Sequence, residues 1–383
     1  MIGRREFVLR TAGAVAGLAV APAGLARVLG AGLGLHSGPA ARGIPGTWAW
    51  VHGGRGQKTP GEWRARFARL RDSGIEGLLV GGGDTRVLSD AAHAEGLEFH
   101  RWLWTLNRSG DTELKASHPD WFMVSREGKS CLEHPPYVPY YKWLCPTREG
   151  ARAHVRRAIE KVAADPAVDG IHLDYVRFPD VILPRGLWEK YGLIQDRELP
   201  EYDFCYCTAC RELFGVQTGL DPADPSALPD PPASEAWRRF RWDRVTHLVE
   251  ELADSVHSHG KPISAAVFPT PSLARRLVRQ AWDEWPLDVY FPMAYHQMYD
   301  EPVSWVGDAA RQGRQAVGPE AQLFAGLYLP HLTPPELEAA IDAIRDGGAS
   351  GVALFESDRL TDDHLSVLAA AVGGAAVPAG VGS

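Results

Sequence analysis

The stretch that decides the fold lies near the middle of the chain and reads Gly170-Ile171-His172-Leu173-Asp174-Tyr175-Val176. It is a short apolar run, typical of a strand buried on both faces of a parallel sheet. Because side chains alternate along a strand, His172 and Asp174 share one face. A carboxylate among apolar side chains is costly to bury unless it is paired or chemically active. Asp174 is therefore the first candidate functional residue, with Arg177 near enough in sequence to be its partner in a structural ion pair.

Runs of similar character precede and follow this stretch, and helical patterns separate them. The other seven candidate strands cover residues 47–51, 77–80, 98–106, 263–268, 288–293, 323–328 and 351–355. Residues 59–62 (Thr-Pro-Gly-Glu) and 333–336 (Thr-Pro-Pro-Glu) are capping boxes that begin helices. Eight strand–helix units in roughly 330 residues predict a closed (β/α)₈ barrel, the TIM barrel of the α/β class. A doubly wound open sheet is the alternative, but residues 52–56 match its phosphate-binding turn poorly.

The N-terminus has the pattern of an export signal. Arg4-Arg5-Glu6-Phe7-Val8-Leu9 resembles the twin-arginine (Tat) motif, and an apolar stretch at 12–21 is too short to span a bilayer as a helix. We therefore expect residues 1–40 to be a leader and the mature protein to be periplasmic or extracellular. Residues 41–375 would form one catalytic barrel, with a Pro- and Cys-rich insertion at about 179–234, and 376–383 a flexible tail.

Composition excludes several classes of partner. The 383-residue chain carries a net charge of −8, which gives no electrostatic footprint for nucleic acid or anionic lipid. No stretch after the leader is apolar and long enough to span a membrane. A carbohydrate is the partner that the remaining features favour.

Active sites of such barrels lie at the C-terminal ends of the strands. The candidate residues there are His52, Asp84, Asn107, Asp174, Arg177, Thr270, Tyr295, His296, Tyr328 and Glu356. Acids, amides, hydroxyls and aromatic rings that converge in this way suit a polyhydroxylated ligand.

Glycosidic cleavage uses two carboxyl groups, one as proton donor and one as nucleophile or base. Asp174 is predicted to be the nucleophile or main electrostatic stabiliser, and Glu356 the acid/base. Glu356 has an alternative role in an ion pair with Arg359. Asp84 competes for the second position, but it also has the pattern of a helix cap.

Aromatic side chains are candidate platforms for sugar rings, and Trp is unusually frequent, with 13 residues. The candidates are Trp48, Trp50, Trp102, Trp104, Trp121 and Tyr328. Trp48 and Trp50 share one strand face, as do Trp102 and Trp104, so either pair has the alternative of filling the barrel interior. Tyr295 and His296 would orient the nucleophile or bind a hydroxyl group.

Three motifs carry a resemblance to a known family. Residues 170–179, 288–295 and 143–146 resemble the fourth-strand, sixth-strand and Trp-Leu-x-Pro motifs of the family-10-like glycosyl hydrolases, which are secreted bacterial TIM-barrel proteins. Cys145 replaces the residue usual in the last motif. The resemblance implies a polysaccharide or peptidoglycan-type substrate and places Asp174 at the family's expected catalytic position, whereas Glu356 belongs to no matched motif.

Three of the five cysteines, Cys205, Cys207 and Cys210, lie close together in the predicted insertion. They are candidate ligands of a structural zinc ion, with the fourth ligand from Cys131, Cys145, a His or an Asp. Disulfide bonds are the alternative, because the exported compartment is oxidising. Catalysis by two carboxylates would require no cofactor.

The predicted function is glycoside hydrolysis, with two alternatives. A non-catalytic glycan-binding barrel would keep the aromatic residues but lack a second carboxylate near Asp174. A metal-dependent hydrolase would use His52, His172, Asp174 and His296, but the chain has no His-x-His or His-Glu-x-x-His pattern.

Overall fold

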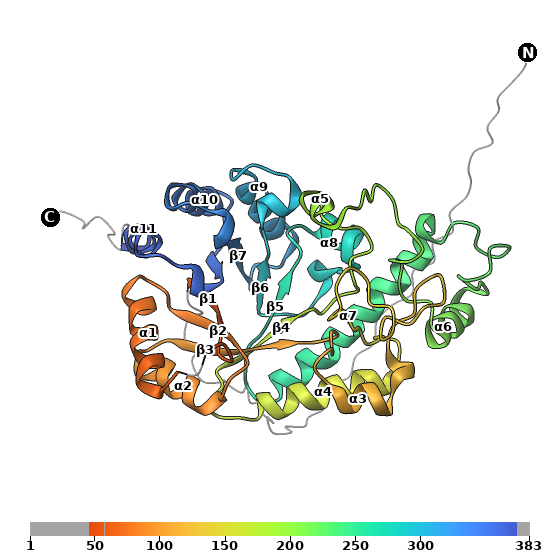
Figure 1. The fold of residues 1–383 in the computed structure, drawn as a ribbon, viewed down its shortest axis with the longest axis horizontal. Coiled ribbons are helices and arrows are strands. Elements are labelled where there is room, and N and C mark those ends of the chain that lie inside the picture. The colour runs from red at the N-terminus through yellow and green to blue at the C-terminus, as the bar shows by residue number, and fades with distance from the viewer. Residues whose placement is uncertain (1–45, 57, 374–383) are drawn as a thin grey trace, which may run out of the picture. The chain divides into compact units, whose positions relative to one another are not determined.

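The computed structural model describes residues 46–56 and 58–373. Eight parallel strands pair in chain order, and the last pairs with the first, so the sheet closes into a barrel. They are β1 (Thr47–His52), β2 (Gly77–Gly81), β3 (Glu98–Trp104), β4 (Gly170–Asp174), β5 (Ile263–Val267), β6 (Val289–Pro292), β7 (Gln322–Tyr328) and β8 (Gly351–Phe355). Helices alternate with the strands around the barrel (Figure 1), which confirms the predicted (β/α)₈ fold.

The longer helices are α1 (Pro60–Asp72), α2 (Thr85–Ala94), α4 (Glu149–Ala163), α6 (Thr208–Thr218), α7 (Glu235–His257), α8 (Pro271–Val278), α9 (Trp305–Ala316), α10 (Pro334–Asp346) and α11 (Asp362–Gly373). Three of these helices, α1, α2 and α10, begin at caps that the sequence indicates. Both predicted capping boxes are present, at Thr59 with Glu62 and at Thr333 with Glu336. Such caps occupy backbone N–H groups that the first helical turn leaves without partners.

The barrel interior is filled by side chains in layers. The interior cluster consists of Trp48, Trp50, Leu79, Trp102, Ala266, Val289, Phe291, Phe324 and Ala353. Glycines make room for the largest rings: a Cβ atom at Gly77 would lie 2.5 Å from Trp48, and one at Gly170 would lie 2.4 Å from His100. The alternate residues of the strands, such as Val51 and Val80, pack outward in a second core beneath the helices. The interior is therefore a packed core, and ligands have access only at its ends.

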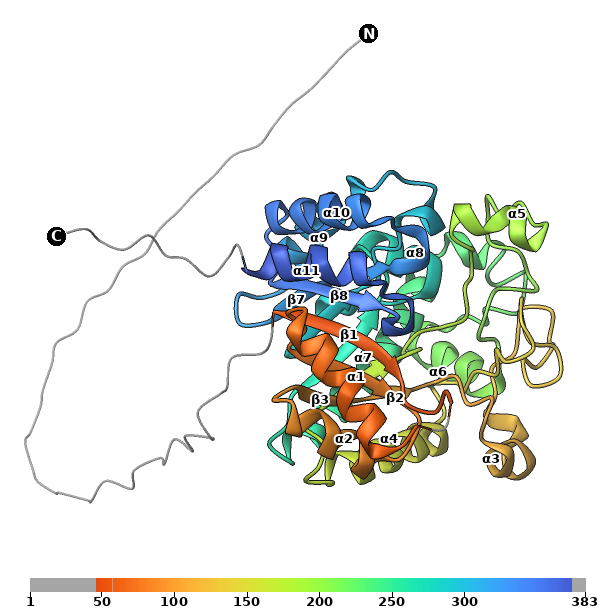
Figure 2. The same cartoon turned by 60° about the vertical axis from the view of Figure 1, so that its left-hand side comes forward.

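Two long connections lie beyond the C-terminal ends of the strands. The first, between β3 and α4, contains α3 (Thr112–Ser117), and the second, between β4 and α7, contains α5 (Trp188–Tyr191) and α6. In Figure 2, α3 and α5 lie on the side toward which the arrowhead of β8 points. These connections therefore adjoin the end of the barrel where active sites form.

The predicted leader at 1–40 and the tail at 376–383 lie outside the described residues. Export, which was inferred from the leader, stays a prediction. No helix among the described residues is long and apolar enough to cross a membrane.

Candidate active site

Asp174 is the last residue of β4 and is partly exposed at the mouth of the barrel. Its Oδ2 accepts a hydrogen bond of 2.9 Å from Trp102 Nε1, and its Oδ1 accepts one of 2.6 Å from the backbone N–H of Tyr175. Burial raises the pKa of Asp174 above the ordinary value, and the two hydrogen bonds offset part of this effect. Asp174 is thus a carboxyl group whose surroundings favour the protonated form.

Arg177 does not form the ion pair with Asp174 that the sequence offers as an alternative. Its Nη1 lies 3.1 Å from Asp180 Oδ2 and donates to the carbonyl oxygen of Phe178. Its guanidinium also packs over the rings of Trp143 and Phe268, at 5.0 and 5.1 Å from their centroids. Arg177 is buried in this arrangement and has a structural role rather than the predicted substrate contact.

Glu356 directly follows β8 and is 7% exposed. Arg55 Nη1 donates to both of its oxygens at 2.8 Å, and His52 Nε2 lies 2.7 Å from Oε2. Arg359, the partner considered from the sequence, is 3.9 Å away. Burial and the charge of Arg55 lower the pKa of His52. Glu356 therefore lies between two basic side chains, His52 at the end of β1 and Arg55 in the turn after it.

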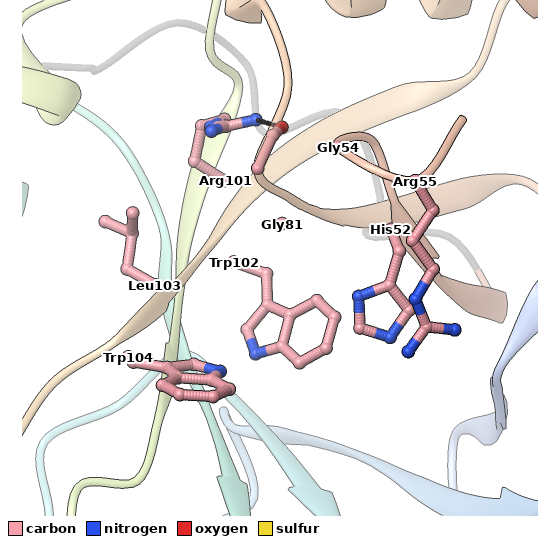
Figure 3. Close-up of a pocket in the computed structure, with 9 residues that line it drawn as sticks. His52, Gly54, Arg55, Gly81, Arg101, Trp102, Leu103 and Trp104 are labelled. Atoms are coloured by element: carbon pink, nitrogen blue, oxygen red, sulfur yellow. Dashed lines mark hydrogen bonds between the residues drawn. The ribbon is translucent and has the colours of Figure 1, made fainter. Parts of the chain in front are cut away.

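A pocket of about 380 Å³ lies at the ends of β1, β2 and β3. It is lined by His52, Gly54, Arg55, Gly81, Gly82, Arg101, Trp102, Leu103 and Trp104. The Trp102 indole lies between Trp104 and His52 (Figure 3), with its ring centroid 4.9 Å from that of His52. Arg101 donates to the carbonyl oxygen of Gly82 at 2.9 Å, which ties β3 to the end of β2. Trp102 thus contacts Asp174 on one side and the partner of Glu356 on the other.

Aromatic rings surround Phe355, the last residue of β8, at the mouth of the barrel. The rings of Tyr295 and Tyr328 both lie 6.0 Å from that of Phe355, and those of His52 and Trp102 lie at 6.1 Å. Burial, followed by the negative charge of Asp174, raises the pKa of Tyr295 well above its ordinary value. Its hydroxyl group is therefore a neutral donor near Asp174.

The two predicted tryptophan pairs have different positions. Trp48 and Trp50 are 0% and 1% exposed in the barrel interior, so they have no face free for a sugar ring, and the alternative of core filling applies to them. Trp102 and Trp104 both line the pocket, and Trp104 is 37% exposed. Trp121 stacks on His118, with their ring centroids 3.9 Å apart, and does not line the pocket.

The remaining polar candidates form hydrogen bonds with the protein backbone. Asp84 caps α2 by accepting from the N–H of Val87 at 3.1 Å. Asn107 is buried, and its side-chain oxygen accepts from the N–H groups of Ser109 and Lys142. Thr270 caps α8 in the same way. Asp84 and Thr270 therefore have structural contacts that account for them without a substrate, whereas the buried Nδ2 of Asn107 has no hydrogen-bond partner among the described residues.

The histidines do not assemble a metal site. His172 is fully buried, with Nε2 accepting from Trp50 Nε1 at 3.1 Å and Nδ1 lying 2.9 Å from Ser264 Oγ. Burial holds its pKa well below the ordinary value, so it is a neutral core residue. His296 is also buried, which lowers its pKa. Within 46–56 and 58–373, only cysteines gather at metal-ligand spacing, so the residues of the alternative metal-dependent hydrolase do not come together, and the fully buried His172 has no face free for a substrate.

The cysteines form one buried cluster. Cys145 joins Cys205, Cys207 and Cys210, and their sulfur atoms all lie within 4.8 Å of one another. Cys131 lies apart and contacts the backbone of Trp143. Thr147 Oγ1 lies 3.2 Å from Cys210 Sγ, and the N-cap position of α4 is occupied by Arg148.

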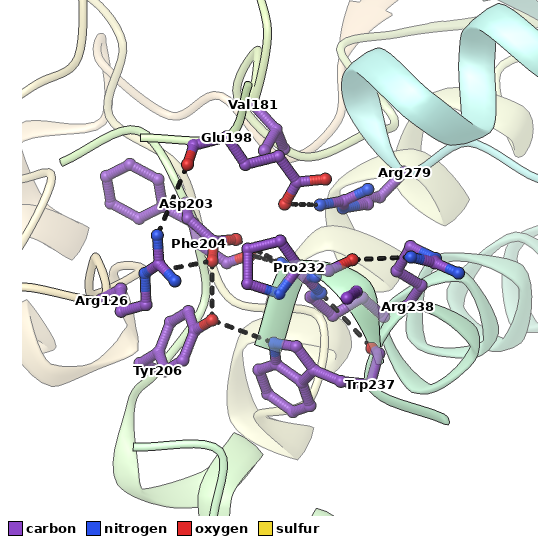
Figure 4. Close-up of polar contacts among 12 residues, drawn as sticks. Arg126, Val181, Glu198, Asp203, Phe204, Tyr206, Pro232, Trp237, Arg238 and Arg279 are labelled. Carbon is purple, nitrogen blue, oxygen red and sulfur yellow. Dashed lines mark hydrogen bonds and ion pairs between the residues drawn. The ribbon is translucent and has the colours of Figure 1, made fainter. Parts of the chain in front are cut away.

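A buried ionic network anchors the chain between β4 and α7 next to this cluster. Asp203 pairs with Arg241 of α7, and both side chains are fully buried. Tyr206 donates to Asp203 Oδ2 at 2.6 Å and accepts from Trp237 Nε1 at 3.2 Å (Figure 4). The network fixes residues 203–206 against α7.

Sequence reasoning missed Arg55, Arg101 and Phe355. Arg55 lies in a glycine-rich turn shortly after β1. Its position near the C-terminal end of a strand was enough to make it a candidate site residue. Arg101 and Phe355 lie inside strands, where only the register of the closed barrel shows that they contribute to the mouth.

Several solved structures share the fold. No protein-family model and no curated protein matches the chain. The glycoside hydrolase domain of PgaB (BpsB) from Bordetella bronchiseptica is 14% identical with a TM-score of 0.60, over 84% of this chain and 96% of that one. The catalytic domain of β-amylase from Paenibacillus polymyxa is 12% identical with a TM-score of 0.58, over 87% and 99%. The β-galactosidase from the psychrophilic Marinomonas ef1 is 13% identical with a TM-score of 0.58, over 86% of this chain and 59% of that one.

These neighbours are glycoside hydrolases built on TIM barrels. At such identities the likeness shows the fold alone. The resemblance to the family-10-like glycosyl hydrolases stays a prediction.

Proposed function

We propose that the protein is a glycoside hydrolase that cleaves a polysaccharide or a peptidoglycan-type glycan, with Asp174 as its principal carboxyl group. The observation that carries the proposal is the setting of Asp174: it ends β4 at the barrel mouth, next to the aromatic pocket, and accepts a hydrogen bond from Trp102. The glycosidase neighbours support a carbohydrate substrate.

The raised pKa of Asp174 favours a role in proton transfer. A glycosidase needs a carboxyl group that stays protonated near neutral pH, donates its proton to the glycosidic oxygen as the bond breaks, and regains a proton from the attacking water. This reverses the roles expected from the sequence, where Asp174 was the nucleophile or stabiliser and Glu356 the acid/base. Tyr295 would assist as a neutral hydrogen-bond donor to the sugar or to Asp174.

Glu356 is the proposed second carboxyl group. Arg55 and His52 surround it with positive or polarisable groups, which suits a negative charge that stabilises a cationic sugar transition state. No cofactor takes part in this chemistry. Trp102 and Trp104 would contact the sugar rings in the pocket, which Trp102 links to Asp174 and His52 links to Glu356.

The test compares wild type with Asp174→Asn on a panel of bacterial and plant glycans, with reducing ends counted. Wild type should cleave at least one glycan, and Asp174→Asn should lose about a hundredfold to ten-thousandfold in rate because it cannot transfer the proton. Asp84→Asn is the matched control: it also changes a carboxylate at a strand end, and Asn caps a helix as well as Asp does.

The binding alternative has its own signature in this experiment. The ion pair of Glu356 with Arg55 is the observation that favours it, because it leaves the second carboxylate already partnered. If neither wild type nor Asp174→Asn cleaves any glycan while both bind one equally, the proposal of catalysis is overturned. Equal loss in Asp84→Asn would move the catalytic role away from Asp174.

A further inference from the structure

Four buried cysteines from two distant connections converge at one point. Cys145 lies before α4, Cys205 and Cys207 lie directly before α6, and Cys210 lies in the first turn of α6. The sulfur of Cys145 is 3.4 Å from that of Cys210 and 3.7 Å from that of Cys207, and all four sulfurs are within 4.8 Å. All four side chains are buried.

These separations match a tetrahedral metal site. Four sulfurs at about 2.3 Å from a central zinc ion are about 3.8 Å from one another. A disulfide would bring two sulfurs to about 2.05 Å, and all five cysteines are free thiols in this structure. The distances thus fit ligands around a shared centre rather than bonded pairs.

The surroundings provide donors and positive charge for thiolates. The backbone N–H of Val124 donates to Cys205 Sγ at 3.4 Å, and Thr147 Oγ1 lies 3.2 Å from Cys210 Sγ. Arg148 donates to Thr208, the residue after Cys207, at 3.0 Å. A zinc ion with four thiolates carries a net charge of −2, which N–H and O–H donors and a nearby arginine offset.

We infer that Cys145, Cys205, Cys207 and Cys210 bind one structural zinc ion. The ion joins the connection before α4 to the connection before α6. Zn²⁺ has no redox chemistry and fills its four positions with these ligands, so the site is closed and holds no water for catalysis. Bound thiolates are also kept from pairing with one another in an oxidising compartment. The inference is independent of the proposed glycosidase activity.

The first experiment measures metal content by mass spectrometry after purification without chelators. Wild type should carry about one zinc per chain. Cys145→Ser should lose most of it, whereas Cys131→Ser should keep it, because Cys131 is a buried cysteine outside the cluster. Stoichiometric iron instead of zinc, or equal zinc in both variants, would overturn the inference.

A second measurement needs no variant and covers the case in which Cys145→Ser fails to fold. Wild type is unfolded in denaturant with a chelator and no reductant, its thiols are alkylated, and the alkyl groups are counted. We expect all five cysteines to be alkylated, with release of the zinc in the same step. Fewer than four alkylated cysteines would mean that the cluster is disulfide-bonded, which contradicts the inference.

Discussion

When Asp174 is ionised, its buried environment lowers the stability of the fold. Its pKa is raised in the folded protein by burial, despite the hydrogen bonds from Trp102 and the Tyr175 N–H. A group with a raised folded pKa contributes its full stability below the unfolded pKa of about 4, and this contribution is lost as the pH rises through the folded value. Above its folded pKa, the ionised carboxylate is therefore a local source of instability.

The thermal unfolding midpoint of Asp174→Asn should consequently rise relative to that of wild type as the pH increases through the folded pKa of Asp174. Asn is neutral like protonated Asp, but its Nδ2 cannot accept, so the variant keeps only one of the two hydrogen bonds from Trp102 and Tyr175, a loss that does not depend on pH. This difference from wild type is smallest below about pH 4, where Asp174 is protonated in both the folded and the unfolded chain, and it grows as the pH rises from there through the folded pKa. Thermal unfolding followed by circular dichroism from pH 3 to pH 8 measures this difference, and a gain that does not depend on pH would contradict the assignment.

At the scale of elements, the chain between β4 and α7 depends on polar anchoring. Asp203 and Arg241 are both fully buried, and Arg241 also donates to the carbonyl oxygen of Phe204 at 3.1 Å. A buried ion pair contributes little compared with well-packed apolar residues, but removing one partner leaves a buried charge uncompensated. This pair therefore determines where residues 203–206 lie more than how stable the barrel is.

Asp203→Asn should lower the free energy of unfolding by about 3–5 kcal/mol, because Arg241 then stays buried without a counter-charge. Asp221→Asn is the matched control: its pair with Arg211 is exposed, and its loss should cost no more than about 1 kcal/mol. Urea unfolding of both variants measures the two values. Similar small losses in both would mean that water reaches Arg241.

At the scale of the whole molecule, glycines inside the barrel allow rings from neighbouring strands to approach closely. Gly170 of β4 pairs in register with His100 of β3, and the ring of His100 occupies the space where a Cβ atom would lie. Gly77 serves Trp48 of β1 in the same way. The first layers of the barrel are therefore shaped by residues that have no side chain.

Gly170→Ala should destabilise the barrel by about 1–3 kcal/mol, the usual cost of overpacking a core. Gly61→Ala, on the exposed surface of α1 with no atom within 4 Å of the added Cβ, should instead stabilise by up to about 1 kcal/mol. Denaturant unfolding compares them. A neutral Gly170→Ala would mean that His100 moves freely to make room.

Which features the sequence predicts depends on how far apart in the chain the interacting residues lie. Strands, helices and caps depend on neighbours in the chain, so the eight-unit barrel and the cap at Asp84 were predictable. The pairing of Glu356 with Arg55 and the addition of Cys145 to the cluster join residues far apart in sequence. The burial of Trp48 and Trp50 depends on which strand face turns inward, and alternation alone leaves that choice open.

The ion pair between Arg55 and Glu356 spans 301 positions of the chain and links the turn after β1 to the residue after β8. A ribosome that has completed β1 to β7 has made Trp102 and Asp174 but has not yet made Glu356. Under the proposed function, the nascent polypeptide is therefore inert until its last strand is synthesised and pairs with its first. A product of premature termination before residue 356 would carry the aromatic pocket and one carboxyl group, and it would leave glycans uncut.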